Sequence, residues 1–306
     1  MSKNVLCIGA LLLDELYFCD QAVQLHTSNP AQKSVSLGGV VANIAQYLAQ
    51  LEVDVSLLTA FGTDSDAVFV QQKLDALYIP YTESISVDAN TGKYISILNP
   101  DGSLQVAVCE DACTASITPD YLASKAAYLN QFEILVIDTN LSSETIQWCI
   151  DFCNSQHKKL FIEPVSVPKA QKLASLSLAG VFMITPNQDE LFAILGNPAV
   201  LSPNQLLEQG VAQVWLRQGA KGSSVHTRSA VIEMSAYPVS VVDSTGAGDA
   251  ALAAWIYGHL TNENPTQCMK MAHALAAEVL QHKGAVVREM TPQKLHQLTQ
   301  NSRYDS

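Results

Sequence analysis

Basic residues are scarce in this chain. Its 306 residues include 17 Lys and Arg against 29 Asp and Glu, which gives a formal net charge of −12. Proteins that bind nucleic acids or anionic membranes need a basic surface. We therefore expect neither a nucleic acid nor a membrane as a partner. A polyanionic substrate would have to be held by local backbone N–H groups and a metal ion, and the simpler reason for the acidity is solubility.

Long apolar runs and paired cysteines are also missing. No stretch of 18 apolar residues occurs, so no membrane span is predicted, and Met-Ser-Lys-Asn leads straight into a strand-like run, which predicts no signal peptide. Seven cysteines without a Cys-x-x-Cys pair indicate neither a disulfide framework nor a zinc ribbon. The spacing of Cys109/Cys113 and Cys149/Cys153 suits a metal on a helix, but only His157 lies near either pair, which disfavours one. We expect a cytoplasmic protein.

Short apolar runs alternate with helical patterns along most of the chain. The runs are Val5–Ile8, Val55–Ala60, Ile134–Ile137, Lys159–Ile162, Val181–Ile184 and Val214–Leu216. The helical patterns are Val41–Leu51, Asp66–Leu77, Glu144–Asn154, Asp189–Leu195, Pro203–Gln209 and Ala251–Leu260. This alternation predicts βαβ units and a mostly parallel sheet covered on both faces. The length and the 48% hydrophobic content fit one large or two ordinary domains.

Two regions interrupt that alternation. Tyr94–Leu98 and Ser103–Val108 surround Asn99-Pro-Asp-Gly102, which predicts a β-hairpin. Glu15–Phe18 and Ser34–Leu37 are expected as further short strands that leave the main sheet. We expect a small β-sheet that covers a cleft, although an ordinary surface hairpin explains the pattern equally well. The lid would be formed by segments near 15–20, 33–38 and 91–110.

The most informative motif is Val-Val-Asp-Ser-Thr-Gly-Ala-Gly-Asp-Ala at residues 241–250, directly before an apolar helical stretch. The backbone N–H groups of Gly246, Ala247 and Gly248 can converge on an anion at the start of that helix. Asp249 places a carboxylate beside the anion, where it can accept the proton of an attacking hydroxyl group. A tight turn with Asp249 as a helix-capping residue is an equally good interpretation.

A second motif opens the first long helix. Gly38 and Gly39 allow the backbone to approach a ligand closely, and Asn43 offers a donor and acceptors that suit a diol. Taken alone, the motif is weak.

Two further motifs follow predicted strands. Asn187 and Glu190 come after the run at Val181, at a strand end that would face the cleft, where they suit a magnesium ion held mainly through water and phosphate. A helix N-terminus with Glu190 favouring the dipole is the alternative. Gly219 to Gly222 forms a turn that could flank a nucleotide, although many hairpins look the same.

In this order the motifs resemble the ribokinase-like carbohydrate kinases, often called the PfkB family, over nearly the whole chain. The matching positions are Gly9 with Asp14, Gly38-Gly39 with Asn43, Asn187 with Glu190, Gly219 with Gly222, and Thr245 to Asp249. Within the family, pseudouridine kinases look similar at Thr91–Tyr94, Asn99–Gly102, Val106–Val108, Asp138–Asn140 and Glu163–Ser166. The resemblance implies a ribokinase-like three-layer α/β fold over a single domain, 1–306, with a mostly parallel central sheet and a small β-sheet lid.

The resemblance also implies an activity, which is the ATP-dependent phosphorylation of the ribose 5′-hydroxyl of pseudouridine with Mg²⁺ and K⁺. Asp249 would be the base, and Gly246, Ala247 and Gly248 would stabilise the transferring phosphoryl group. The substrate would contact Asp14, Gly38, Gly39, Asn43, Thr91, Tyr94, Asn140 and Asp249. The nucleotide would contact Asn187, Arg217, Gly219, Gly222, Thr245, Gly246 and Gly248. Glu190 would hold Mg²⁺ through water, and Asp243 with Thr245 would hold the monovalent cation.

The chain departs from the family pattern at a few positions. Arg217 stands where Thr or Ser is common, and it either pairs with the ATP phosphates or points to solvent. Glu163 replaces the usual Asp, while Glu52 and Ala67 replace glycines. None of these changes removes a group that the chemistry needs.

Other functions stay open on the sequence alone. A related kinase could act on ribose, a hexose, adenosine or inosine, and a pocket for pseudouridine should offer an additional acceptor for its extra ring N–H. A non-catalytic nucleotide- or sugar-binding sensor could use the same fold, but it would have no use for Asp249. An exposed lid sheet would also offer the surface for a homodimer.

Overall fold

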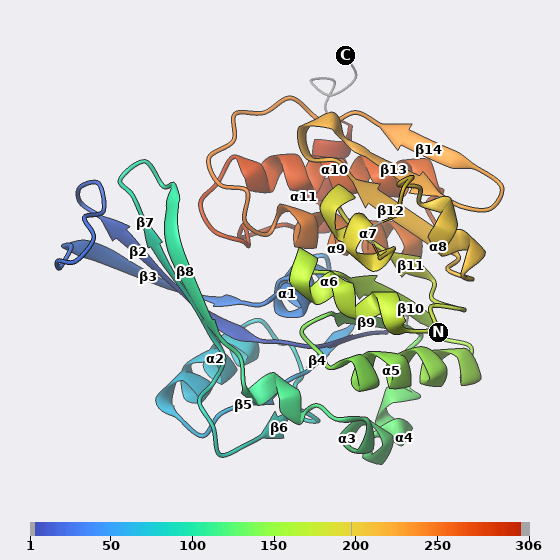
Figure 1. Cartoon of the computed structure of the whole chain (residues 1–306), viewed down its shortest axis with the longest axis horizontal. Helices are drawn as coiled ribbons and strands as arrows, with labels where there is room; N and C mark the ends of the chain where they lie inside the picture. Colours follow the sequence, from blue (N-terminus) through green and yellow to red (C-terminus); the bar gives the residue numbers. More distant parts are fainter. Residues whose placement is uncertain (1–3, 197, 301–306) are drawn as a thin grey trace.

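The structure is a computed structural model that describes residues 4–196 and 198–300 (Figure 1). The first three residues, on which the expectation of no signal peptide partly rests, lie outside the described part, as does the end of the predicted 1–306 domain. That the chain is a single domain therefore stays a prediction.

The central sheet has eight strands in the order β14-β13-β12-β11-β10-β9-β1-β4. The six strands from β4 to β12 run parallel, and β13 and β14 are antiparallel at one edge. The mostly parallel sheet predicted from the sequence is confirmed. The strands are β1 Val5–Ile8, β4 Val55–Leu58, β9 Ile134–Asp138, β10 Lys159–Glu163, β11 Met183–Ile184, β12 Gln213–Arg217, β13 Ser223–His226 and β14 Val231–Met234.

Helices cover both faces of this sheet, as predicted (Figure 1). Side chains of β1 alternate, so that Val5 and Cys7 pack on one face and Leu6 and Ile8 on the other. The first face carries α1 Val40–Gln50, α2 Ser65–Ala76, α9 Ala247–Leu260, α10 Pro265–Leu280 and α11 Pro292–Thr299. The second carries α3 Pro119–Ser124, α4 Ala126–Leu129, α5 Ser143–Ser155, α6 Val167–Ala170, α7 Gln188–Ile194 and α8 Asn204–Glu208.

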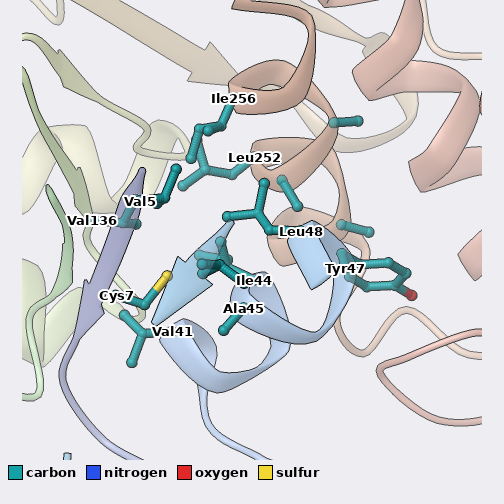
Figure 2. Close-up of a cluster of buried hydrophobic side chains, with 14 of the residues drawn as sticks. Val5, Cys7, Val41, Ile44, Ala45, Tyr47, Leu48, Val136, Leu252 and Ile256 are labelled. Atoms are coloured by element: carbon teal, nitrogen blue, oxygen red, sulfur yellow. The ribbon is translucent and has the colours of Figure 1, made fainter. Parts of the chain in front are cut away.

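Helix α9 lies in the middle of the first layer and is apolar on all sides. It packs against α1 and α10 as well as the sheet, so nearly every residue of α9 is buried. Leu252 and Ile256 of α9 meet Ile44 and Leu48 of α1 (Figure 2). Because α9 is clamped in this way, its first turn is fixed relative to α1 and to the ends of the strands.

A second, four-stranded sheet extends from the body in the order β3-β2-β7-β8 (Figure 1). The predicted hairpin is present as the antiparallel pair of β7 and β8, and β2 pairs in parallel with β7. The strands are β2 Leu12–Cys19, β3 Ala31–Gly38, β7 Lys93–Leu98 and β8 Leu104–Glu110, and a small third sheet joins β5 Ala60–Phe61 to β6 Ile85–Ser86. That the second sheet closes as a lid stays a prediction, as does a homodimer through its exposed residues Val35, Val106 and Val108.

No helix within residues 4–196 and 198–300 is long and apolar enough to cross a membrane. All seven cysteines are free thiols. Cys109 lies on β8 and Cys113 in a separate 3₁₀ turn, so these two cysteines are not on one helix. Cys149 and Cys153 are both on α5, where they are buried in the core.

The packing of α1 against α9 predicts a stability difference between two leucines. Leu48→Ala should lower the free energy of unfolding by about 2–5 kcal/mol, because Leu48 is fully buried between the two helices and the change leaves a cavity. Leu104→Ala on the lid, where the side chain is 55% exposed, should change it by about 0.5 kcal/mol or less. Urea unfolding of both variants measures the difference, and equal losses would contradict the assigned packing.

Candidate active site

The first turn of α9 forms an anion-binding geometry. Gly246 precedes the helix with φ 74°, and a Cβ atom there would overlap the carbonyl oxygen of Ala285, so only glycine fits this position. The first helical hydrogen bond runs from the N–H of Ala250 to the carbonyl oxygen of Gly246 (2.9 Å). Within the described part of the chain, no acceptor reaches the N–H groups of Gly248 and Asp249, which remain available for an anion.

Asp249 lies in this turn with only 8% of its surface exposed. Its Oδ2 accepts a hydrogen bond from Asn43 Nδ2 at 2.9 Å. Burial raises the pKa of Asp249 to about 7, and the charge of Glu163 adds to the rise, while Asn43 and Arg217 oppose it. The helix cap is Gly246, so the interpretation of Asp249 as the capping residue is wrong.

The predicted sugar-binding residues form a continuous series of contacts. A Cβ on Gly38 would overlap the carboxylate of Asp14, so that carboxylate lies directly over the glycine. Gly39 has φ 93° and precedes α1, where a Cβ would come within 2.5 Å of the carbonyl oxygen of Ala10. The N–H of Asn43 then donates to the carbonyl oxygen of Gly39 at 2.8 Å. Since Asn43 also binds Asp249, the two motifs meet in one place.

Asp14 faces the same side of the lid sheet as Tyr94. The two residues are register partners on β2 and β7, and Cys109 of β8 lies opposite Tyr94 in the next pair. Burial raises the pKa of Asp14 to about 7. The carboxyl group of Asp14 is therefore poised to change charge near neutral pH. Sequence reasoning missed Cys109, which only the strand register brings next to Tyr94.

Thr91 is buried, and its hydroxyl and N–H groups are used in hydrogen bonds to the loop that contains Gly62 and Asp64. Its hydroxyl group donates to Asp64 Oδ1 at 2.6 Å and accepts from the N–H of Gly62 at 3.1 Å. The N–H of Thr91 donates to the other oxygen of Asp64 at 2.9 Å. These bonds fix the loop before β7, and among the described residues Thr91 has no hydrogen bond to Asp249 or Asp14. A role of Thr91 at the substrate stays a prediction.

Asn140 lies just after β9, at the end of the Asp138–Asn140 segment that the sequence analysis matched to related kinases. Its side-chain oxygen accepts from the ammonium group of Lys169 on α6, and its N–H donates to Asp138 Oδ1 at 2.9 Å. Asp138 is fully buried against Gly9, and its Oδ2 has no partner among the described residues. Burial raises the pKa of Asp138 to about 7. An acidic residue at the end of a central parallel strand is the signal that could have identified Asp138.

Asn187 and Glu190 form a capping box at the start of α7. Asn187 Oδ1 accepts from the N–H of Glu190 at 2.8 Å, and Glu190 Oε2 accepts from the N–H of Asn187 at 2.9 Å. The helix N-terminus that the sequence analysis gave as an alternative is confirmed. Burial, followed by the charge of Glu163, raises the pKa of Glu190. In residues 4–196 and 198–300, no group of three or more His, Cys, Asp or Glu could hold a metal ion, and a Mg²⁺ site at Asn187 and Glu190 stays a prediction.

Arg217 turns inward at the end of β12. Its Nη2 donates to Glu163 Oε1 at 2.6 Å, and Thr185 Oγ1 donates to Glu163 Oε2 at 2.5 Å. A Cβ on Gly248 would lie 2.5 Å from Arg217 Nη1, so the guanidinium group lies against the first turn of α9. The alternative that Arg217 points to solvent is wrong.

The remaining residues predicted to bind the nucleotide and a cation lie on loops. Gly219 begins a 3₁₀ turn that ends before Gly222 and connects β12 to the antiparallel β13. This segment is therefore the turn of a β-hairpin, and its contact with a nucleotide stays a prediction. Asp243 accepts from the N–H groups of Thr245 and Gly284, each at 2.9 Å. Burial would raise the pKa of Asp243, but these two hydrogen bonds keep it below its ordinary value. Asp243 is therefore charged and ties the loop before α9 to the loop after α10.

Comparison with known proteins agrees with this arrangement. The sequence model of the pfkB family carbohydrate kinases matches residues 2–291. The pseudouridine kinase of Escherichia coli (strain K12) is 28% identical over 83% of this chain and 84% of its own length. A carbohydrate kinase from Agrobacterium tumefaciens superposes with a TM-score of 0.86 at 22% identity, covering 97% of both chains.

Arabidopsis thaliana ribokinase, solved with ribose and ATP, has a TM-score of 0.83 at 20% identity and covers 98% of this chain and 99% of its own. Structural likeness at this identity shows the ribokinase-like fold, while the match of the family model over most of the chain shows the family. The chain therefore belongs to the pfkB family of carbohydrate kinases, and it is a phosphotransferase with a hydroxyl group as acceptor.

Proposed function

We propose that this protein transfers the γ-phosphoryl group of ATP to the ribose 5′-hydroxyl group of pseudouridine. The observation that carries the proposal is the buried carboxylate of Asp249 beside the unpaired N–H groups at the start of α9, held there by Asn43. The similarity to the pseudouridine kinase of Escherichia coli supports the choice of acceptor.

In the proposed reaction, the 5′-hydroxyl oxygen forms a bond to the γ-phosphorus atom, and the hydroxyl proton passes to Asp249. The bond between that phosphorus atom and the β–γ bridging oxygen breaks, and its electron pair leaves with ADP. The N–H groups of Gly248 and Asp249 stabilise the charge on the transferring group. Gly246 and Ala247 hold the backbone in the turn that aims these N–H groups.

On the sugar side, Asp14, Gly39 and Asn43 bind the ribose hydroxyl groups, because a carboxylate and an amide together can satisfy a vicinal diol. Gly38 leaves the space that the carboxylate of Asp14 occupies. Tyr94 flanks the nucleoside from the lid, which closes and excludes water as a competing acceptor. Asn140, paired with Lys169, and Thr91, through the loop that it fixes, act at the edge of the nucleoside pocket.

On the nucleotide side, Arg217 contacts the phosphates, Gly219 and Gly222 line the nucleotide, and Asn187 and Glu190 orient the water ligands of Mg²⁺. A Mg²⁺ ion held there would neutralise negative charge on the phosphates. Each carboxylate oxygen of Asp243 retains a lone pair beyond its backbone hydrogen bond, so Asp243 and Thr245 can bind a monovalent cation, which we propose to be K⁺.

The role of Asp249 as base predicts a specific loss in the Asp249→Asn variant. Turnover should fall by about 10²–10⁴-fold or more, while ATP affinity stays the same, because the amide keeps the shape but cannot take the proton. Asp120→Asn is the matched control, since Asp120 lies exposed in the first turn of α3, and it should keep full activity. Coupled assays of ADP release and calorimetric titration with ATP measure both quantities. Normal turnover in Asp249→Asn would remove Asp249 from the role of base.

The raised pKa of Asp249 predicts the pH dependence of kcat/KM. The carboxylate is the active form and its pKa lies at about 7, so kcat/KM should fall as the pH drops below about 7 and should level off above it. Asp14, with a similar pKa, would make the fall steeper. A rate profile between pH 5 and 9 checks this, and a flat profile down to pH 5 would contradict it.

The proposed acceptor predicts a ranking of substrates. Pseudouridine should give the highest kcat/KM, and uridine should be lower by roughly 10²-fold or more, because a pocket acceptor for the extra ring N–H would be left unpaired. Ribose and adenosine complete the panel. Higher kcat/KM with ribose would instead make the protein a sugar kinase, and tight binding of nucleosides without turnover would make it a sensor.

A further inference from the structure

Three neighbouring strand ends bring together a buried ion pair beside α9. Glu163 ends β10, Thr185 follows β11 and Arg217 ends β12. Both carboxylate oxygens of Glu163 are used, one by Arg217 Nη2 and the other by the hydroxyl group of Thr185. The Glu163 side chain is 5% exposed and that of Arg217 is 18% exposed, so the pair is largely shielded from solvent. The guanidinium group is thus held from one side only.

Most hydrogen-bond donors of Arg217 are unused. A guanidinium group has five N–H donors, and within the described part of the chain only its Nη2 has a side-chain acceptor. Nη1 lies against Gly248, next to the N–H groups that face the proposed phosphoryl position. A cation at a helix N-terminus is unfavourable, because the helix dipole is already positive there. An anion bound between the guanidinium group of Arg217 and the N-terminus of α9 would offset this repulsion.

We propose that Glu163 is a positioning residue that holds Arg217 so that Nη1 contacts the phosphoryl group during its transfer. The inference rests on the proposed function and deepens it. Charge on the three non-bridging oxygens is shared between Nη1 and the N–H groups of Gly248 and Asp249 as the 5′-oxygen bonds to the phosphorus atom and the bridging oxygen leaves with ADP. A charge fixed before the reaction stabilises the transition state without reorganisation.

The ion pair with Glu163 also limits which other carboxylates the guanidinium group of Arg217 can contact. Arg217 lies near the carboxylates of Glu190 and Asp249 as well as that of Glu163. Without Glu163, the guanidinium group would be free to pair with the base itself, which would lower the pKa of Asp249 and draw its carboxylate away from the acceptor. The short bond to Glu163 prevents this exchange and keeps the cation and the base separate.

The test is a double-mutant cycle in the full chain. Arg217→Ala should lower kcat by about 10²–10³-fold, because it removes one hydrogen-bond donor to the developing anion. Glu163→Gln should lower kcat by about 10–100-fold, because it removes the residue that orients Arg217. KM for the nucleoside should stay within about threefold in both variants, because the contact is made in the transition state. Glu163→Gln should then have almost no further effect in the Arg217→Ala background, since Glu163 acts through Arg217.

The control and the folding check are independent of the active site. Glu83→Gln breaks an ion pair with Lys125 of the same 2.6 Å length on the surface, and it should leave kcat unchanged. Thermal unfolding shows whether each variant is folded. Affinity for ADP with aluminium fluoride, a mimic of the phosphoryl group in transfer, should fall in Glu163→Gln while affinity for ADP alone stays the same.

Two results would overturn the inference. Losses that multiply in the double variant would show that Glu163 acts independently of Arg217, and unchanged kcat in both single variants would show that the pair is only structural. If either of these results is found while the wild-type protein turns over and Asp249→Asn does not, the proposed function stands and the inference falls. If the wild-type protein turns over no acceptor in the panel, both fall together.

Discussion

A hydrogen bond between Asn43 and Asp249 joins the first turns of two helices that are 206 residues apart in the sequence. It forms because α1 and α9 pack along their apolar faces on one side of the sheet, and because glycine precedes each helix where the backbone must turn sharply. The bond joins the segment proposed to bind the sugar, with Asp14 and Gly39, to the turn proposed to bind the phosphoryl group. The amide also supports the charged form of a carboxylate that burial alone would keep protonated. This contact therefore joins the proposed base to the segment proposed to bind the sugar.

The groups around the carboxylate of Asp249 have opposite effects on its pKa. Burial and then Glu163 raise its pKa, while Asn43 and Arg217 lower it, and the balance leaves the pKa at about 7. Such a balance suits a general base, which must be ionised yet still accept a proton. Arg217 and Glu163 are both departures from the family pattern in the sequence, and the structure places them in contact. The two departures therefore form one ion pair in this chain.

Much of the architecture could be predicted from the sequence, because the alternation of apolar runs and helical patterns reflects a buried parallel sheet. The glycines of the motifs at residues 38–39 and 246–248 were informative for a similar reason, since their positions demand close backbone approach. What could not be predicted depends on pairing between distant segments. The direction of the Arg217 side chain depends on its bond to Glu163, which is 54 residues away in the sequence. The hydroxyl group of Thr91 is used in a bond to Asp64, which no local sequence pattern indicates. Asp138 was named only as part of a matching segment, because its burial depends on the strands that surround it.

The central claim is that a nucleoside hydroxyl group, the carboxylate of Asp249 and a γ-phosphate group meet at the first turn of α9. A crystal structure with pseudouridine and a non-hydrolysable ATP analogue measures this directly. We expect the 5′-oxygen within about 2.6–3.2 Å of a carboxylate oxygen of Asp249, with the γ-phosphate at the N–H groups of Gly248 and Asp249. A nucleoside bound with its 5′-oxygen far from Asp249, or a triphosphate that avoids the start of α9, would contradict the account.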